Sequence, residues 1–255
     1  MCRAIYPSRS IVAILILFIG LSSALIGSGA EKNPSTPARK PAQNKLTAAE
    51  RRGGWRLLFD GKSTAGWRSF KKTTFPEKGW VLVDECLKHL SKAGGGDIIT
   101  IDRFQEFDLK FEWKIAPGAN SGLKYFITED RSGAIGHEYQ VIDEKHDAES
   151  LRGGKWQTGG LYDCLPPKAD KKLKPPGEFN TSRILVRAKR VEHWLNGEKI
   201  LDFELESPEL KAAVAQSKFK TVEGFGTSFP GHILLQDHGD EVCFRNIKIK
   251  NLATH

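Results

Sequence analysis

Residues 107–115 have the sequence FDLKFEWKI, in which every second side chain is large and apolar and the residues between are charged. Because successive side chains of a β-strand point to opposite faces of a sheet, this alternation predicts a strand with one face in a core and the other in water. From Gly53 onward, short segments rich in β-branched and aromatic residues recur roughly every 8–12 residues, separated by Gly, Pro, Asn or Asp. This spacing predicts an all-β sandwich or barrel.

The other predicted elements follow from similar patterns. Asn196-Gly197 lies between two apolar-patterned runs and predicts a two-residue hairpin, because both positions of such a turn need positive φ. One segment, 207–218, predicts a helix, since Ser207 can cap it and Pro208 suits its first turn. The predicted strands are 55–59, 80–83, 98–101, 107–115, 123–128, 138–142, 183–187, 191–195, 199–203, 233–236 and 242–249.

The formal net charge is +8, which raises the question of a nucleic-acid or membrane partner. Residues 1–52 contain eight of the Lys and Arg residues and two of the Asp and Glu residues, so this segment alone carries +6. The rest of the chain carries +2. We therefore expect a nearly neutral folded domain and no nucleic-acid partner; the alternative, nucleic-acid binding, would show a steep dependence on salt.

The N-terminus has the order of a secretory signal peptide. Arg3 and Arg9 come first, an apolar run follows to Ile26, and Ser28-Gly29-Ala30 forms a cleavage site of small residues. An uncleaved anchor is the alternative, but the run is shorter than the roughly 20 residues that span a bilayer. The sequence predicts a signal peptide over 1–30, a basic Pro-rich linker over 31–52 and a domain over 53–255, exported to the periplasm or the extracellular space without stable membrane insertion after cleavage.

Cysteines are few for an exported domain. With Cys2 in the predicted signal peptide, Cys86, Cys164 and Cys243 remain, so at most one disulfide can form. The sequence has no CxxC motif, and no cysteine spacing fits a zinc site. Burial of apolar side chains must therefore supply most of the stability.

Candidate functional residues lie on three predicted strands. Alternation places Glu138 and Gln140 on one face of their strand, His193 beside Val191 and Leu195 on the next, and Gln236 with His238 on the third. If these strands belong to one curved sheet, the five polar side chains line a shared concave cleft. The alternative for each is a role in the fold, because a His or Gln between apolar neighbours is commonly a hydrogen-bonded structural residue.

Two familiar hydrolytic motifs are incomplete. His137-Glu138 begins like the zinc-protease motif H-E-x-x-H, but Val141 stands where the second histidine is needed. Glycosidases usually need two positioned carboxylates, and the strand after Glu138 offers only Gln140 and Ile142 on the same face. This strand therefore lacks the carboxylate pair of an ordinary sandwich glycosidase.

Several motifs, in order along the chain, resemble the 3-keto-disaccharide hydrolase domain family. The match runs from about Trp55 to Leu252 and departs from the family at Glu178-Phe179-Asn180, where a Trp-Asn pair is expected. The resemblance implies a concanavalin-like jelly-roll sandwich of two antiparallel sheets with one short helix, export from a bacterial cell, and action on 3-keto-glycosides. The motifs are LLFDGKS at 57–63 with Gly66-Trp67, NSGLKYF at 120–126, EYQVID at 138–143, GLYD at 160–163, HWLNG at 193–197, QDHG at 236–239 and FRNIK at 244–248.

Cleavage of a 3-keto-glycoside does not require two carboxylates on one strand. A ketone at C3 acidifies the C2 proton of a sugar, so a base can remove this proton, the C1 substituent can leave, and water can add afterwards. We expect His238 or His193 to be the base, Lys124 or Gln236 to stabilise the enolate oxygen, and Glu138 to orient or protonate the substrate. The predicted substrate-binding residues are Gln140, Gln236, Asn120, Asp163 and three aromatic residues that would stack on sugar rings, Tyr125, Trp156 and Tyr162.

Two further alternatives stay open. A divalent metal ion could replace the lysine as electrophile, although spacing alone does not establish one; the oxygen and nitrogen ligands on offer are Glu138, Asp143, His146, Asp163 and Asp237. No cofactor is otherwise expected, and the expected partner is a carbohydrate substrate. The alternative to an enzyme is a lectin-like carbohydrate-binding module on the same scaffold, because function is determined by the site and not by the fold.

Overall fold

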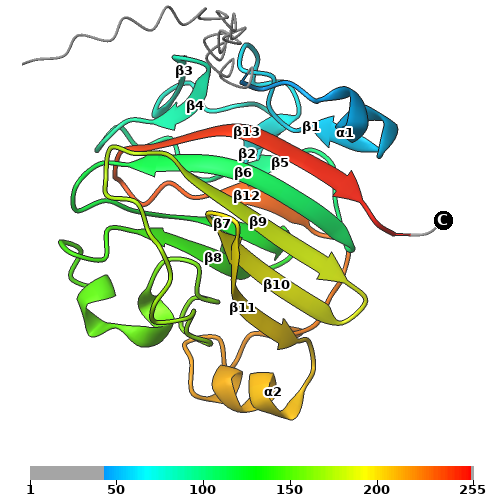
Figure 1. Cartoon of the computed structure of the whole chain (residues 1–255), viewed down its shortest axis with the longest axis vertical. Helices are drawn as coiled ribbons and strands as arrows, with labels where there is room; N and C mark the ends of the chain where they lie inside the picture. The colour runs from blue at the N-terminus through cyan, green and yellow to red at the C-terminus, as the bar shows by residue number, and fades with distance from the viewer. Residues whose placement is uncertain (1–42, 254–255) are drawn as a thin grey trace, which may run out of the picture. The chain divides into compact units, whose positions relative to one another are not determined.

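A computed structural model describes residues 43–253, so the predicted signal peptide and residues 31–42 of the predicted linker lie outside the described residues. Two antiparallel sheets pack face to face (Figure 1). The large sheet has eight strands in the order β11-β10-β9-β6-β13-β4-β3, with β1 also paired to β13, and the small sheet has five in the order β2-β5-β12-β7-β8. This architecture confirms the predicted all-β jelly-roll sandwich.

The large sheet contains β1 (Trp55–Leu57), β3 (Trp80–Val83), β4 (Cys86–His89), β6 (Phe107–Ile115), β9 (Asn180–Arg187), β10 (Arg190–Leu195), β11 (Glu198–Glu204) and β13 (Val242–Asn251). The small sheet contains β2 (Trp67–Ser69), β5 (Ile98–Thr100), β7 (Asn120–Ile127), β8 (His137–Ile142) and β12 (His232–Leu235). The short strands β2 and β4 were not predicted from the sequence; the other strands were, with ends that differ by a few residues.

The alternating strand 107–115 is β6, near the middle of the large sheet. Its apolar side chains are buried and its charged ones are partly exposed, as predicted. The ring of Phe111 meets Tyr139 of the small sheet edge to face, with centroids 5.6 Å apart. The indole of Trp113 donates a hydrogen bond to Ser182 Oγ at 2.8 Å, and that hydroxyl donates to Tyr139 at 2.9 Å. The core therefore lies between the sheets and contains a few hydrogen-bonded polar groups.

The predicted hairpin and helix are both present. Asn196 and Gly197 have φ of 48° and 87° and join β10 to β11. Helix α2 spans Pro208–Ala215, and its N-cap Ser207 accepts a hydrogen bond from the Leu210 amide at 3.1 Å. Two 3₁₀ turns, η1 (Ser150–Arg152) and η2 (Gly154–Trp156), lie in the long connection after β8. Among residues 43–253, no helix is both long and apolar enough to cross a membrane.

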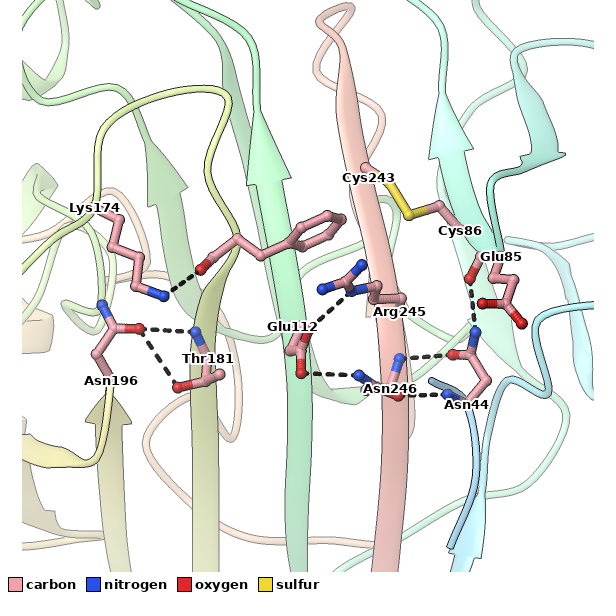
Figure 2. A network of polar contacts seen from close by, with 11 residues as sticks. Asn44, Glu85, Cys86, Glu112, Lys174, Thr181, Asn196, Cys243, Arg245 and Asn246 are labelled. Atoms are coloured by element: carbon pink, nitrogen blue, oxygen red, sulfur yellow. Dashed lines mark hydrogen bonds and ion pairs between the residues drawn. A yellow bond between two sulfur atoms is a disulfide. The ribbon is translucent and has the colours of Figure 1, made fainter. Parts of the chain in front are cut away.

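Part of the predicted linker belongs to the fold. Residues 43–52 include helix α1 (Ala48–Arg52), capped by Thr47, and the almost fully buried Asn44. Asn44 exchanges two hydrogen bonds with Asn246 of β13, at 2.5 and 2.8 Å, and donates a third to the Glu85 carbonyl (Figure 2). Sequence reasoning missed this segment because it is polar and rich in basic residues, and its order comes from hydrogen bonds to distant strands.

A disulfide joins two neighbouring strands of the large sheet, Cys86 on β4 and Cys243 on β13 (Figure 2). It agrees with the expectation of at most one bridge, and the remaining Cys164 is buried as a free thiol. The two cysteines are 157 residues apart in the chain, so the bridge restricts a long loop in the unfolded state.

Replacing both Cys86 and Cys243 by Ser is expected to lower the free energy of unfolding by about 2–4 kcal/mol, because the unfolded chain regains its loop entropy. Denaturant unfolding of the two proteins, each with and without reductant, measures the difference. Reductant should destabilise the wild type and leave the double variant unchanged; equal stability of both proteins in oxidising buffer would contradict the prediction.

Candidate functional site

The outer face of the small sheet carries the polar residues that the sequence singled out. Leu123, Tyr139 and Leu235 point inward to the core, so their chain neighbours Lys124, Glu138 and Gln236 point outward. The register places Lys124 of β7 opposite Glu138 of β8 and opposite Leu234 of β12. One row further along, Gly122 lies opposite Gln140. We call this surface the site face.

Glu138 is held on the site face at its β8 edge. Its Oε2 lies 3.5 Å from Lys124 Nζ. With the oxygen and nitrogen of the Gln140 side-chain amide exchanged, so that both find hydrogen-bond partners, the amide nitrogen donates to Glu138 Oε1 at 3.1 Å. The carboxylate leans over Gly122: a Cβ there would lie 2.5 Å from Glu138 Oε1. The absence of a side chain at Gly122 therefore leaves the space that the Glu138 carboxylate occupies, beside the Lys124 ammonium.

The connection after β8 adds Glu149 and Tyr162 to this cluster. The Tyr162 hydroxyl donates to Glu149 Oε1 at 2.5 Å, and Asn120 donates to Glu149 Oε2 at 3.4 Å. The pKa of Tyr162 is raised well above its usual value by burial, by the hydrogen bond to Glu149, and by the charges of Glu149 and Glu138. Tyr162 therefore stays protonated and serves as a hydrogen-bond donor. Sequence reasoning missed Glu149, which lies in an irregular segment without periodicity.

Asp97, directly before β5, is a second carboxylic acid on the site face, and sequence reasoning missed it as well. Continuing the register of β5, β12 and β7 puts Asp97, Gln236 and Gly122 in one row. Burial raises the pKa of the Asp97 carboxyl, the charge of Lys124 opposes that rise, and the charges of Glu138 and Asp237 add to it. The absence of a carboxylate pair thus holds for β8 alone, since the fold supplies a second carboxyl group from another strand.

Two of the predicted site residues lie inside the core. His193 and Tyr125 are fully buried between the sheets, where Tyr125 Oη is 3.0 Å from His193 Nε2 and the Gly159 carbonyl is 2.9 Å from His193 Nδ1. Burial lowers the pKa of His193 to about 4. The predictions that His193 acts as a base on substrate and that Tyr125 stacks on a sugar ring are wrong, because neither side chain reaches the surface.

The other predicted residues lie in the turn after β12 and in the connection after β8. His238 is exposed in the turn after β12, two residues beyond Gln236. Trp156 stacks under the Arg152 guanidinium at 3.6 Å. Asp163 pairs with Lys155 at 2.8 Å and accepts from the Lys218 amide at 2.7 Å, so its carboxylate holds the loop that carries Tyr162.

The five residues considered as metal ligands do not come together. Asp143 and His146 contact each other at 2.7 Å, whereas Asp163 pairs with Lys155, and Asp237 lies 3.0 Å from the buried His89. Within the described part of the chain, no three His, Cys, Asp or Glu side chains are grouped in a way that could hold a metal ion.

A separate cavity of about 420 Å³ lies over the outer face of the large sheet, with Lys110, Glu112, Arg183 and Trp194 among its lining residues. Two of its charged groups are already paired, Glu112 with Arg245 at 2.8 Å and Arg183 with Asp108 at 2.6 Å. The site face, with Glu138, Lys124 and Asp97, is therefore the better candidate for chemistry.

Comparison with known proteins identifies the class. Two solved structures from Parabacteroides distasonis, both assigned provisionally as glycosyl hydrolases, are similar to this chain. The first is 35% identical with a TM-score of 0.75 and covers 83% of this chain and 100% of its own. The second is 27% identical with a TM-score of 0.62 and covers 78% and 99%. The fold and these relatives define a class of carbohydrate-active sandwich enzymes.

The family is narrower than this class. Residues 54–250 match the model of the 3-keto-alpha-glucoside-1,2-lyase-like domain, and the chain belongs to this family. A curated protein of Bacteroides thetaiotaomicron, named 3-keto-disaccharide hydrolase, is 31% identical over 291 residues, which cover 99% of this chain and 100% of that protein. The predicted resemblance and the predicted enzyme acting on glycosidic bonds are confirmed.

Gly122→Ala tests the arrangement of the Glu138 carboxylate. The new methyl group must displace the Glu138 side chain, so activity should fall at least about 10-fold, whereas the melting temperature should change little because the displaced atoms end a flexible side chain. Steady-state kinetics and thermal unfolding measure the two effects. Gly133→Ala is the control, since a Cβ there meets only Ile135 at 3.9 Å. Undiminished activity of Gly122→Ala would show that the Glu138 position is unimportant.

His137→Phe tests the buried histidines as structural groups. His137 is stacked between Tyr125 and Phe225, both ring nitrogens are without hydrogen-bond partners, and burial lowers its pKa to about 3 from about 6.5. Between these two pH values the unfolded chain binds a proton that the folded chain does not, so the free energy of unfolding falls as the pH is lowered.

Removing His137 should make this fall shallower by up to about 1.4 kcal/mol per pH unit. Urea unfolding from pH 7 to pH 4 measures it, with His238→Asn as a control at an exposed histidine. The idea fails if the pH dependence of His137→Phe equals that of the wild type.

Proposed function

We propose that this protein cleaves 3-keto-glycosides, including 3-keto-disaccharides, by elimination of the C1 substituent and subsequent hydration. The family and the curated relative support the substrate class. The observation that carries the proposal is the Glu138 carboxylate, held over Gly122 beside the Lys124 ammonium on the site face. Such a pair suits removal of an acidified C–H proton, which needs one base and one cation near the developing enolate.

In this proposal Glu138 is the base, in place of the histidines expected from the sequence. Glu138 takes the proton from C2, the electron pair moves toward the C3 oxygen, and Lys124 stabilises the charge that develops there. The C1–O bond then breaks to leave a 1,2-unsaturated ketone. Water adds to C1 and a proton returns to C2, so that the net reaction is hydrolysis.

Neighbouring polar groups would bind the sugar hydroxyls. Gln140 and Asn120 present side chains on the same face, and Tyr162 is a protonated donor at its edge. The buried Gln236 Oε1 has no hydrogen-bond donor in the described structure, so a donor near it would complete its hydrogen bonding. His238, exposed two residues beyond Gln236, would contact the leaving group.

We also propose export to the periplasm or the extracellular space. The order of basic, apolar and small residues over 1–30 supports it, and so does the Cys86–Cys243 disulfide, since such bridges persist in oxidising compartments. The near-neutral charge of residues 53–255 gives no reason to propose a nucleic-acid partner.

Glu138→Gln is expected to lower kcat/KM on a 3-keto-glycoside by at least about 100-fold while the glycoside still binds, because the amide cannot accept the C2 proton. Product release and calorimetric binding measure the two effects. Glu112→Gln, on the outer face of the large sheet, is the matched control and should keep full activity.

In D₂O the first product released should carry deuterium at C2, at a level above that of authentic product incubated with the same enzyme. Equal turnover of unmodified glucosides without deuterium at C2 would point to ordinary hydrolysis. Tight binding of 3-keto-glycosides without any turnover would identify a carbohydrate-binding module instead.

A further inference from the structure

Elimination from a glycoside needs an acid as well as a base, because an alkoxide is a poor leaving group near neutral pH. The base proposed above, Glu138, lies at the β8 side of the site face. Asp97 is the other carboxyl group whose charge interacts with both Lys124 and Glu138. We propose that Asp97 is the catalytic acid that protonates the departing glycosidic oxygen, an inference that rests on the proposed function.

The spacing across the sheet suits this role. Asp97 lies two strands away from Gly122, which corresponds to about 10 Å between backbones. Because the Glu138 carboxylate leans over Gly122, the row of Asp97, Gln236 and Gly122 has a carboxyl group at each end. Carboxyl groups that act from opposite sides of a ring are roughly 6.5–9.5 Å apart in inverting glycosidases. A ring seated over Gln236 would thus have the base on one side and the acid on the other.

Asp97 is held in place by groups that leave it a free oxygen. Its Oδ1 accepts from the Asp237 amide at 2.9 Å, and the Asp237 carboxylate accepts from the Gly96 amide at 2.9 Å. The fully buried His89 lies 3.0 Å from Asp237 Oδ1 and 2.9 Å from the Asp240 carbonyl. Asp97 Oδ2 has no such contact among the described residues, so this oxygen is the one that can carry the proton.

The surroundings of Asp97 favour its protonated form. The charged groups that act on it are Lys124 from β7, Glu138 from β8 and Asp237 from the turn after β12. Burial and the two carboxylates raise its pKa, the Lys124 charge and the hydrogen bond from the Asp237 amide oppose them, and the net pKa lies above the usual value of an aspartic acid. A carboxyl group that keeps its proton at higher pH than usual is suited to donating it during the reaction.

The two carboxyl groups carry out both proton transfers of the elimination. Glu138 takes the C2 proton, the C1–O bond breaks, its electron pair stays on the oxygen, and the Asp97 proton moves to that oxygen to give an alcohol and the unsaturated ketone. In the hydration step, Asp97, now a carboxylate, takes a proton from the water that attacks C1, and Glu138 returns its proton to C2. Both residues are restored, and no further reactant is needed.

Asp97→Asn tests the proposal, because the amide keeps an oxygen for the Asp237 N–H but has no acidic proton. On methyl 3-keto-α-glucoside, whose leaving group needs protonation, kcat should fall by about 100-fold or more. On the 4-nitrophenyl analogue, whose phenolate leaves unaided, kcat should fall less than about 10-fold. Asp108→Asn, a matched change at a partly buried carboxylate of the large sheet, should affect neither substrate.

The wild type gives a second measurement that does not depend on folding of a variant. Its rate on the methyl glycoside should decline as the pH rises and Asp97 loses its proton, and its rate on the nitrophenyl glycoside should not show that decline. Equal losses in Asp97→Asn on both substrates, or identical pH profiles, would overturn the assignment of Asp97. Inactivity of the wild type on both glycosides would instead overturn the proposed function.

Discussion

Packing of the inner face of the small sheet against the large sheet determines which way every functional side chain points. Tyr139 shows this most directly: its ring meets Phe111, and its hydroxyl donates to the Trp194 carbonyl and accepts from Ser182, both on the large sheet. With Tyr139 fixed inward, Glu138 and Gln140 must point outward, because side chains of a strand alternate. A slip of one residue in β8 would turn both side chains into the core between the sheets and turn core side chains outward, so the stability of the sandwich and the position of the candidate site have the same origin.

Much of the fold could be predicted from the sequence because long strands repeat one pattern many times. Strand 107–115 alternates over its whole length, and Asn196-Gly197 specifies a turn through backbone conformation alone. Strands β2 (WRS) and β4 (CLKH) contain no β-branched residue, so they lack the composition by which equally short strands such as β3 and β5 were predicted. The helix α1 was missed because its polar segment gains order from the contact of Asn44 with Asn246, which is 202 positions away.

For the site, alternation identified faces correctly but could not say which face is outside. Glu138, Gln140 and Lys124 do share a face, as expected from their strands. His193 shares a face with Val191 and Leu195, and that face of β10 points into the core, where His193 meets Tyr125 from the opposite sheet. Asp97 gave no signal, because the next two residues, Ile98 and Ile99, are both apolar and buried on opposite faces. Only the pairing of β5, β12, β7 and β8 in the folded sheet shows that Asp97 lies on the same face as Glu138.

The place of β13 in the large sheet has a consequence for how the protein acquires its structure. This strand pairs with β6 along one side and with β4 and β1 along the other, so it connects segments made early and midway through synthesis. It spans Val242–Asn251, so the middle of the sheet cannot form until the ribosome has moved roughly 200 residues beyond its partner β1. Early segments are left with unpaired strand edges during that time, and long-range pairing of this kind is slow.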